Sequence, residues 1–318
     1  QSLGPVVCIS PWNFPLAIPA GMVAAALVSG NPVLFKPSER ASIMGYRLAT
    51  ILRQAGVPAG VLQYVPGGPD VGRELVTQAS VATIAFTGSK DVGLGMVQAA
   101  AVQQPGQKFV KRVIAEMGGK NAIIVDDTAD LDEAVTGVVQ SCTGYAGQKC
   151  SACSRVILLD SIHDAFIQRL ADAVMSLRIG AAEDPATQVG PVIDGRAQKR
   201  IRDYLEIGRR EGRVVVDRSM EGPGHAVGPV VIAGIEPTHR LAQEEIFGPV
   251  LAVMRASSFE QALQLANGTA YALTGGLYSR SPRHIELARQ AFDVGNLYIN
   301  RSITGALVGR QPFGGHRL

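Results

Sequence analysis

The chain has 318 residues, of which 47% are hydrophobic and 18% are charged, and its formal net charge is +3. This length is enough for two domains with cores of their own, and the composition excludes an intrinsically disordered protein. The basic residues are scattered and the net charge is small, so no nucleic acid partner is expected. The longest apolar run, around residues 20–29, is too short to span a bilayer, so no membrane partner is expected either.

The four cysteines are too few for a disulfide framework in a chain of this size, which favours a reducing compartment such as the cytoplasm. Cys150 and Cys153 have the spacing of a zinc-binding pair. A zinc site needs further ligands, yet there is no second C-x-x-C pair and the histidines are isolated. We therefore expect no metal, and we expect Cys8 and Cys142 to be packed core thiols.

Short β-branched runs alternate with helical patterns over the first part of the chain. Strands are expected at 6–10, 33–36, 62–65 and 83–86. Helices are expected at 21–28, 42–55, 70–77 and 90–101. This alternation predicts an α/β fold, with a parallel sheet covered by helices on both faces.

The same alternation returns further along the chain. Strands are expected at 122–125, 156–159, 250–254, 275–278 and 296–300. Helices are expected at 131–142, 162–177, 196–211, 258–267 and 282–292. We expect two α/β domains, 1–118 and 119–318, because the Gly118-Gly119 pair allows the chain to turn between them.

A cysteine and a carboxylate lie on glycine-containing turns. Cys150 follows Gly147-Gln148-Lys149, and Glu116 precedes Met117 and a Gly-Gly pair. A thiolate can attack an electrophilic carbon, and a carboxylate can then activate water. The pair therefore indicates covalent thiol catalysis.

The segment from Pro11 to Pro15 follows the first expected strand, where ligands bind in open α/β sheets. Asn13 can donate a side-chain N–H to a developing oxyanion. The alternative is an ordinary turn with a packed Trp12.

Lys36 and Glu39 follow the second strand. A lysine and a carboxylate there suit the hydroxyls of an adenosine ribose, and the carboxylate would repel a 2′-phosphate, which favours NAD over NADP. The alternative is a solvated ion pair.

Two glycine turns also follow strands. Ser89, after Thr87-Gly88, is expected at a helix N-terminus, where backbone N–H groups attract phosphate, and Gly68 and Gly72 form a second turn. An ordinary helix cap is the alternative for each. Glu244 and Glu245 are adjacent carboxylates just before the aromatic Phe247. Taken alone, they indicate no more than the charged end of a helix.

Taken together, these segments resemble the aldehyde dehydrogenase superfamily, in family order and over essentially the whole chain. The segments are 11–15, 36–39, 86–89, 116–120, 147–150, 245–250 and 312–315. The resemblance implies a Rossmann-type cofactor domain followed by an α/β catalytic domain. Met117 stands where the family usually has Leu, a volume-conserving change.

The resemblance assigns roles to individual residues. Cys150 corresponds to the nucleophile, Asn13 to the side-chain half of the oxyanion hole, and Glu116 to the base for hydrolysis. It implies NAD as the cofactor. The implied cofactor-binding residues are Ser10, Pro11, Trp12, Lys36, Ser38, Glu39, Gly68, Gly72, Thr87, Gly88, Ser89, Glu245 and Phe247.

A finer match, over 111–117, 150–155 and 300–313, is similar to the branch of L-glutamate γ-semialdehyde dehydrogenases. It implies oxidation of that small-molecule aldehyde to L-glutamate in proline breakdown. The implied substrate-binding residues are Phe14, Ser151, Gly305, Ala306 and Phe313. Exposed backbone N–H groups and a hydroxyl can bind a carboxylate without a buried cation. Ile303-Thr304 departs slightly from the Thr-Thr of this branch.

Two other functions stay open. One is another non-acylating aldehyde dehydrogenase, for instance acting on succinic semialdehyde, whereas Glu116 disfavours acyl transfer to coenzyme A. The other is an inactive nucleotide-binding fragment, because members of the family are longer at both ends and the chain resembles an internal piece. For the parent protein the resemblance implies a homo-oligomer, and fusion to a proline dehydrogenase is one arrangement open to it.

Overall fold

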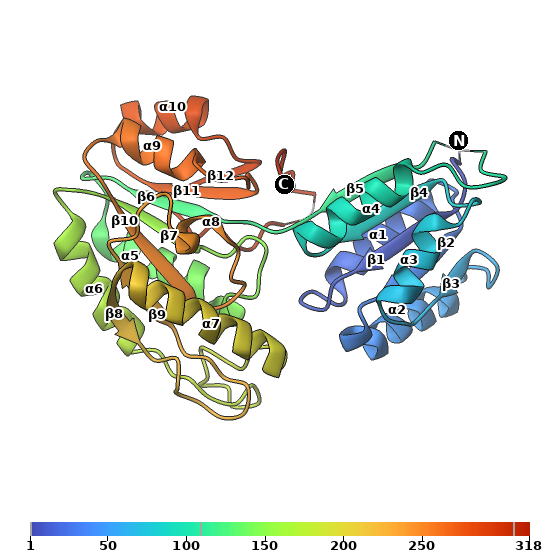
Figure 1. The fold of residues 1–318 in the computed structure, drawn as a ribbon, viewed down its shortest axis with the longest axis horizontal. Coiled ribbons are helices and arrows are strands. Elements are labelled where there is room, and N and C mark those ends of the chain that lie inside the picture. Colours follow the sequence, from blue (N-terminus) through green and yellow to red (C-terminus); the bar gives the residue numbers. More distant parts are fainter. Residues whose placement is uncertain (1, 109, 308) are drawn as a thin grey trace. The chain divides into compact units, whose positions relative to one another are not determined.

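The computed structural model describes residues 2–108, 110–307 and 309–318, and the chain forms two compact units, Gln1–Met117 and Gly118–Leu318 (Figure 1). The division falls one residue before the boundary expected from the Gly118-Gly119 pair. None of the helices in these ranges is both long enough and apolar enough to cross a membrane.

The first unit is built on a five-stranded parallel sheet with the order β3-β2-β1-β4-β5. Its strands are β1 (Val6–Ser10), β2 (Val33–Pro37), β3 (Leu62–Tyr64), β4 (Thr83–Thr87) and β5 (Arg112–Glu116). Its helices are α1 (Ala17–Val28), α2 (Ser42–Gln54), α3 (Pro69–Thr77) and α4 (Lys90–Ala101), with a short 3₁₀ turn η1 (Glu39–Ala41).

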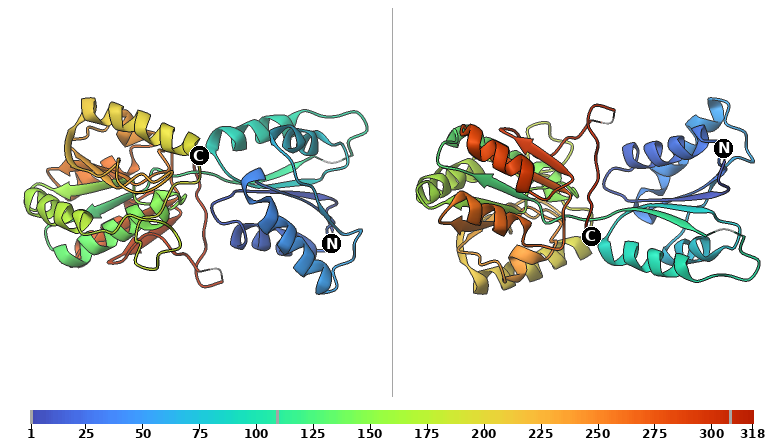
Figure 2. Two further views of the ribbon diagram at one scale, coloured as in Figure 1. Left: turned by 90° about the horizontal axis from the view of Figure 1, so that it is seen from below. Right: turned by 90° about the horizontal axis from the view of Figure 1, so that it is seen from above.

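Helices cover both faces of this sheet, as predicted (Figure 2). Val6 and Cys8 of β1 pack with α1 and α2, whereas Val7 and Ile9 pack with α3 and α4. This alternation follows from the two-residue period of a strand. The chain runs from β1 to β2 and β3 on one side and then to β4 and β5 on the other, so strand order reverses between β1 and β4. Ligands bind at such a switch point, outside the carboxyl ends of the strands.

The second unit contains a seven-stranded sheet with the order β12-β11-β6-β7-β10-β9-β8, parallel except that β8 runs antiparallel to β9. Its strands are β6 (Ala122–Val125), β7 (Arg155–Leu159), β8 (Arg213–Asp217), β9 (Val230–Ala233), β10 (Val250–Ala256), β11 (Thr274–Tyr278) and β12 (Asn296–Ile299).

The helices of this unit are α5 (Leu131–Thr143), α6 (His163–Met175), α7 (Gly195–Glu211), α8 (Arg240–Gln243), α9 (Phe259–Asn267) and α10 (Pro282–Ala291), with a 3₁₀ turn η2 (Gly144–Gly147). Helices α9 and α10 lie against one face of the sheet and α5 and α6 against the other (Figure 2). Right-handed crossovers that run in opposite directions along a sheet require this arrangement.

Three strands, the four-residue helix α8 and one helix start differ from the prediction. Strand β5 was not expected because it is an edge strand whose Arg112 and Ile114 are exposed, so it lacks the apolar pattern of a buried strand. Strands β8 and β9 contain β-branched runs next to glycines, a pattern that does indicate strands and that the prediction did not use. Helix α1 begins at Ala17 rather than at residue 21, because Pro19 fits the first turn of a helix, where its missing N–H costs nothing.

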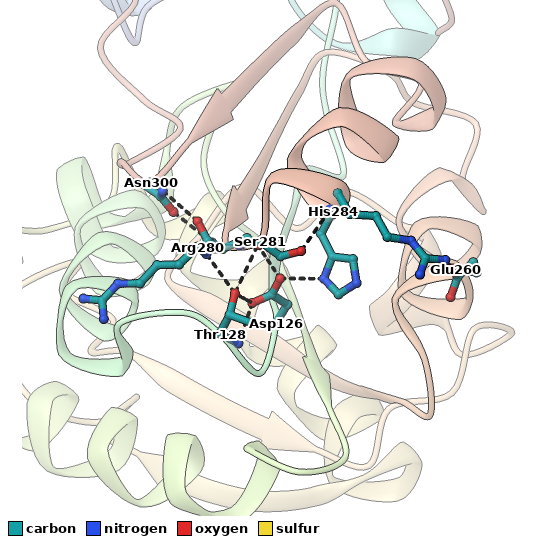
Figure 3. Close-up of polar contacts among 9 residues, drawn as sticks. Asp126, Thr128, Glu260, Arg280, Ser281, His284 and Asn300 are labelled. Atoms are coloured by element: carbon teal, nitrogen blue, oxygen red, sulfur yellow. Dashed lines mark hydrogen bonds and ion pairs between the residues drawn. The ribbon is translucent and has the colours of Figure 1, made fainter.

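A buried carboxylate, Asp126, connects the carboxyl ends of β6 and β11 and the start of α10 (Figure 3). Asp126 is fully buried and accepts hydrogen bonds from the Thr128 N–H (2.8 Å) and hydroxyl (2.7 Å) and from the hydroxyl of Ser279. Nδ1 of His284 lies 2.8 Å from the same carboxylate. The His284 ring stacks on the Phe259 ring, with centroids 4.2 Å apart.

Asp126, Asp127 and His284 lie close enough together to share a metal ion. Both oxygens of Asp126, however, already accept hydrogen bonds from the protein. The proximity of these residues is therefore explained by the tie between strand ends, and it is not evidence for a metal site.

Candidate active site

A cavity of about 640 Å³ lies in the first unit, at the carboxyl ends of β1, β2 and β4. Every residue of this unit that the sequence predicts to bind cofactor lines it. These residues are Ser10, Pro11, Trp12, Lys36, Ser38, Glu39, Gly68, Gly72, Thr87, Gly88 and Ser89. Side chains from four separate segments thus converge at the switch point of the sheet.

Lys36 and Glu39 line this cavity, and Gly68 and Gly72 lie close to their side chains. Lys36 is only 6% exposed, and its ammonium donates a 3.3 Å hydrogen bond to the carbonyl of Pro37. Burial lowers the pKa of Lys36, and the charge of Glu39 opposes that shift. A Cβ at Gly68 would lie 3.2 Å from the Glu39 carboxylate, and one at Gly72 would lie 3.5 Å from Lys36 Cε. The alternative of a solvated pair is therefore wrong for Lys36.

The turn between β4 and α4 also borders the cavity. Ser89 is the N-cap residue of α4, as predicted, with an extended backbone and no hydrogen bond from its side chain to the helix. A Cβ at Gly88 would lie 2.5 Å from the Phe86 ring, and the Gly88 N–H donates to the Glu116 carbonyl at 3.0 Å. The helix N-terminus, with its N–H groups and dipole, is suited to an anion.

Two of the predicted catalytic residues belong to the first unit. Asn13 lies in the bend that follows β1, and it is 7% exposed. Glu116 is the last residue of β5 and is partly buried. Burial raises the pKa of the Glu116 carboxyl. A raised pKa brings a carboxylate closer to the basicity that a general base needs near neutral pH.

The third predicted catalytic residue, Cys150, follows a strained turn, η2, in the second unit. Tyr145, Ala146 and Gly147 all have positive φ, at 60°, 52° and 68°. A Cβ at Gly147 would lie 2.4 Å from the carbonyl oxygen of Gly248. Positive φ is costly for residues other than glycine, and it persists where the surroundings fix it, commonly at functional sites.

Cys150 is partly exposed, whereas the other three cysteines are buried. Burial raises the pKa of Cys8 and of Cys142 to about 12 and also raises that of Cys153. The Cys153 thiol donates to the carbonyl of Arg155 at 3.3 Å, inside the core. Cys153 therefore does not share a site with Cys150, and Cys8 and Cys142 are packed thiols as predicted.

The two adjacent glutamates beyond α8 have different surroundings. Glu244 pairs with Arg240 and accepts a 2.6 Å hydrogen bond from the Tyr204 hydroxyl, and the Arg240 hydrogen bond lowers its pKa to about 2. Glu245 instead accepts a 2.9 Å hydrogen bond from the Gly119 N–H. The alternative of a charged helix end therefore describes Glu244 and not Glu245. Phe247 has a positive φ of 58°.

The residues predicted to bind substrate are spread over both units. Phe14 belongs to the first unit, whereas Ser151, Gly305, Ala306 and Phe313 belong to the second. Ser151 is 8% exposed and Phe313 is 42% exposed. Gly305 has a positive φ of 84°. No hydrogen bond joins Ser151 to residues 305–306 in the described ranges, and Val308 of the matching segment lies outside them.

Residues 1–318 match the family model described as the aldehyde dehydrogenase family. The chain belongs to this family. Its α/β fold is accordingly the aldehyde dehydrogenase fold, as the resemblance implied.

Proteins named 1-pyrroline-5-carboxylate dehydrogenase are among its relatives. The protein of Geobacillus thermodenitrificans is 49% identical over 99% of this chain and 62% of its own length. The protein of Bacillus subtilis is 44% identical over 100% of this chain and 62% of its own length. The chain thus spans about 62% of the length of these curated relatives.

Solved structures give the same match. A 1-pyrroline-5-carboxylate dehydrogenase from Thermus with bound NAD is 47% identical with a TM-score of 0.97, over 99% of this chain and 61% of that chain. Proline utilization A from Bdellovibrio bacteriovorus is 48% identical with a TM-score of 0.97, over 100% of this chain and 33% of that chain.

One departure from the usual aldehyde dehydrogenase sequence has a structural explanation. Met117 stands where the family usually has Leu, and a Cβ at Gly93 of α4 would lie 2.7 Å from its sulfur. Gly93 therefore leaves room for the longer thioether next to the Phe86 ring. The flexible methionine fills this gap with little change in volume.

Sequence reasoning missed several residues of this aldehyde dehydrogenase site. Asn121 and Thr274 bind the backbone around Cys150, and Gln148 accepts a 2.8 Å hydrogen bond from the Ile193 N–H. Lys120 is 1% exposed with no partner for its ammonium in the described chain, and burial, together with nearby Arg155, lowers its pKa to about 7. A polar residue just before a buried strand was the one signal for Asn121.

Proposed function

We propose that the complete protein oxidises L-glutamate γ-semialdehyde to L-glutamate with NAD, through a thiohemiacetal and a thioester on Cys150. The observation that carries this proposal is that Cys150 alone among the cysteines is not buried. It follows closely on three consecutive residues with positive φ, Tyr145, Ala146 and Gly147. The substrate is supported by the relatives named 1-pyrroline-5-carboxylate dehydrogenase at 44% and 49% identity.

In the first half of the reaction, the Cys150 thiolate adds to the aldehyde carbon. Charge then develops on the aldehyde oxygen, where the side-chain N–H of Asn13 and the backbone N–H of Cys150 stabilise it. Bound NAD would supply the acceptor for the hydride of this carbon, so that the thiohemiacetal on Cys150 becomes a thioester. A thiolate is the nucleophilic form, so an accessible thiol is needed, and the three buried thiols are unsuitable.

In the second half, Glu116 acts as a general base. Its carboxylate takes a proton from water while the water oxygen adds to the thioester carbonyl, and the Cys150 thiolate leaves as L-glutamate forms. The raised pKa of Glu116 supports this role, because it increases the basicity of the carboxylate.

The residues of the first unit fit NAD. The cavity combines a helix N-terminus at Ser89, suited to pyrophosphate, with the Lys36 ammonium and the Glu39 carboxylate, suited to ribose hydroxyls. Gly68 and Gly72 leave open the space that a Cβ would take beside Glu39 and Lys36. In the second unit we assign Glu245 and Phe247 to the nicotinamide ribose and ring.

We assign the substrate carboxylate to Ser151 and to the backbone N–H groups of Gly305 and Ala306. Phe14 and Phe313 would cover the aliphatic part. The positive φ of Gly305 supports a turn that offers adjacent N–H groups to an anion. The chain has four cysteines, too few for a disulfide framework, which favours the cytoplasm as the compartment. A homo-oligomer and a fusion to proline dehydrogenase stay predictions, the latter supported by similarity to a bifunctional proline utilization A.

A substrate panel tests this function. NADH formation by the complete protein is measured with L-glutamate γ-semialdehyde, succinic semialdehyde and propanal. The proposal predicts the highest kcat/KM for L-glutamate γ-semialdehyde. A higher value for succinic semialdehyde would assign the protein to another non-acylating activity, and the absence of NADH with all three would leave nucleotide binding as its function.

A further inference from the structure

Three consecutive carbonyl groups of the Cys150 loop are bound by two buried side chains. The Nδ2 amide of Asn121 donates to the carbonyls of Cys150 at 2.8 Å and Ala152 at 2.9 Å. The hydroxyl of Thr274 donates to the carbonyl of Ser151 at 3.3 Å. Asn121 is 4% exposed and Thr274 is 1% exposed, so these contacts lie away from water.

The Asn121 side chain is itself held by the backbone of Thr274. Oδ1 of Asn121 accepts a 3.0 Å hydrogen bond from the Thr274 N–H. Asn121 comes immediately before β6, and Thr274 is the first residue of β11, which pairs with β6. The contacts therefore originate from neighbouring strands of the seven-stranded sheet, which is a rigid support for a loop.

Gly119 fixes the Cys150 carbonyl from a further side. A Cβ at Gly119 would lie 2.5 Å from this carbonyl oxygen and 2.8 Å from the Asn121 amide nitrogen. The carbonyl thus packs directly against the Gly119 backbone, with its hydrogen bond to Asn121 alongside. The peptide group between Cys150 and Ser151 has little freedom to rotate.

These contacts determine the direction in which the Ser151 N–H points. In a trans peptide the N–H points opposite to the carbonyl, so the Ser151 N–H points away from Asn121. The next peptide group is fixed through the Ser151 carbonyl by Thr274. Within the described ranges, neither the N–H nor the hydroxyl of Ser151 makes a hydrogen bond, although the residue is only 8% exposed.

We propose that Asn121 and Thr274 are positioning residues, which hold the two peptide groups on either side of Ser151 so that its N–H and hydroxyl bind the substrate carboxylate. The inference rests on the proposed function, which places that carboxylate at Ser151. Two donors on one fixed residue suit a carboxylate, which accepts at both oxygens. Asn121 and Thr274 do not touch the substrate themselves.

Two substitutions remove the positioning contacts with little change in shape. Asn121→Asp replaces the Nδ2 donor by an oxygen that repels the carbonyls of Cys150 and Ala152, and it keeps an acceptor for the Thr274 N–H. Thr274→Val removes the hydroxyl that donates to the Ser151 carbonyl, whereas Thr274→Ser keeps a hydroxyl at this position.

Matched controls make the same chemical changes elsewhere. Asn267→Asp removes an amide group that donates to the Ala291 carbonyl at 2.7 Å. It keeps the side-chain oxygen that accepts from the Asp293 N–H at 2.9 Å. In Thr136→Val, the lost hydroxyl binds the Asp132 carbonyl at 2.9 Å on the exposed surface of α5.

The measurement is protection of Cys150 from iodoacetamide by L-glutamate, in the complete protein without cofactor. Asn121→Asp and Thr274→Val should each raise the half-protecting L-glutamate concentration about tenfold, as expected for weakened hydrogen bonds to a charged group. Thr274→Ser should restore protection, and Asn267→Asp and Thr136→Val should protect like the unmodified protein.

Unchanged protection in folded Asn121→Asp and Thr274→Val would overturn the inference, and so would equal losses in the two control variants. If Asn121→Asp does not fold, Thr274→Val with its Ser counterpart decides. Failure of the proposed function has a different signature, because L-glutamate would then give no protection of Cys150 in the unmodified protein.

Discussion

The backbone N–H of Gly119 donates a 2.9 Å hydrogen bond to the carboxylate of Glu245. The two residues are far apart in sequence, and neither glycine of the Gly118-Gly119 turn has room for a side chain. A Cβ at Gly118 would lie 2.3 Å from the Glu245 carboxylate. The residue that we assign to the nicotinamide ribose is therefore held by the turn that follows the proposed base, Glu116.

Gly118→Ala should displace the Glu245 carboxylate and weaken cofactor binding. We expect the KM for NAD to rise about tenfold, the effect of losing one hydrogen bond to a charged group. Gly21→Ala is the matched control, because a Cβ at Gly21 would meet nothing within 4 Å. Steady-state kinetics at varied NAD checks both variants. A normal KM for NAD in Gly118→Ala would remove Glu245 from the cofactor site.

Glu116→Gln should stop hydrolysis of the thioester and leave its formation intact, because only the second half of the reaction uses the carboxylate. Rapid mixing should show a burst of NADH followed by slow turnover, and mass spectrometry should find an acyl group on Cys150. Rapid steady turnover by Glu116→Gln would contradict the assignment of the base.

The hydrolytic step should depend on pH in the direction set by Glu116. Burial raises the pKa of this carboxyl, and only the ionised form takes a proton from water. Hydrolysis should therefore be fast above the raised pKa and should be lost as pH falls through it, at a higher pH than for an exposed glutamate. Single-turnover decay of the thioester against pH measures this. Decay that does not slow toward acid pH would argue for another base.

Glu39→Gln should narrow the preference for NAD over NADP. The carboxylate accepts hydrogen bonds from the ribose hydroxyls and repels a 2′-phosphate, and the amide lacks the charge. We expect the ratio of kcat/KM for the two cofactors to fall about tenfold, equivalent to about 1.4 kcal/mol. Equal use of both cofactors by the unmodified protein would show that Glu39 does not discriminate.

The position of the cofactor residues in the first unit could be predicted because each motif follows a buried, β-branched strand. Parallel strands bring their carboxyl ends to one edge of the sheet, so Trp12, Lys36 and Ser89 had to gather there. Strand β5 could not be predicted, because its exposed Ile114 and Arg112 give no pattern of burial.

The support of the Cys150 loop could not be predicted for a different reason. Asn121 and Thr274 bind backbone carbonyls far away in sequence, and no side-chain pattern marks such contacts. The strained φ values of Tyr145 and Ala146 are likewise invisible in the sequence, because neither residue is a glycine.

The central claim is that Cys150 is the nucleophile, and the most direct test compares two single substitutions in the complete protein. Cys150→Ala should abolish NADH formation from L-glutamate γ-semialdehyde while NAD binding, measured by calorimetry, is nearly unchanged. Cys153→Ala, which removes a buried thiol two residues further on, should keep most of the activity. Substantial activity in Cys150→Ala, or an inactive but folded Cys153→Ala, would contradict the account.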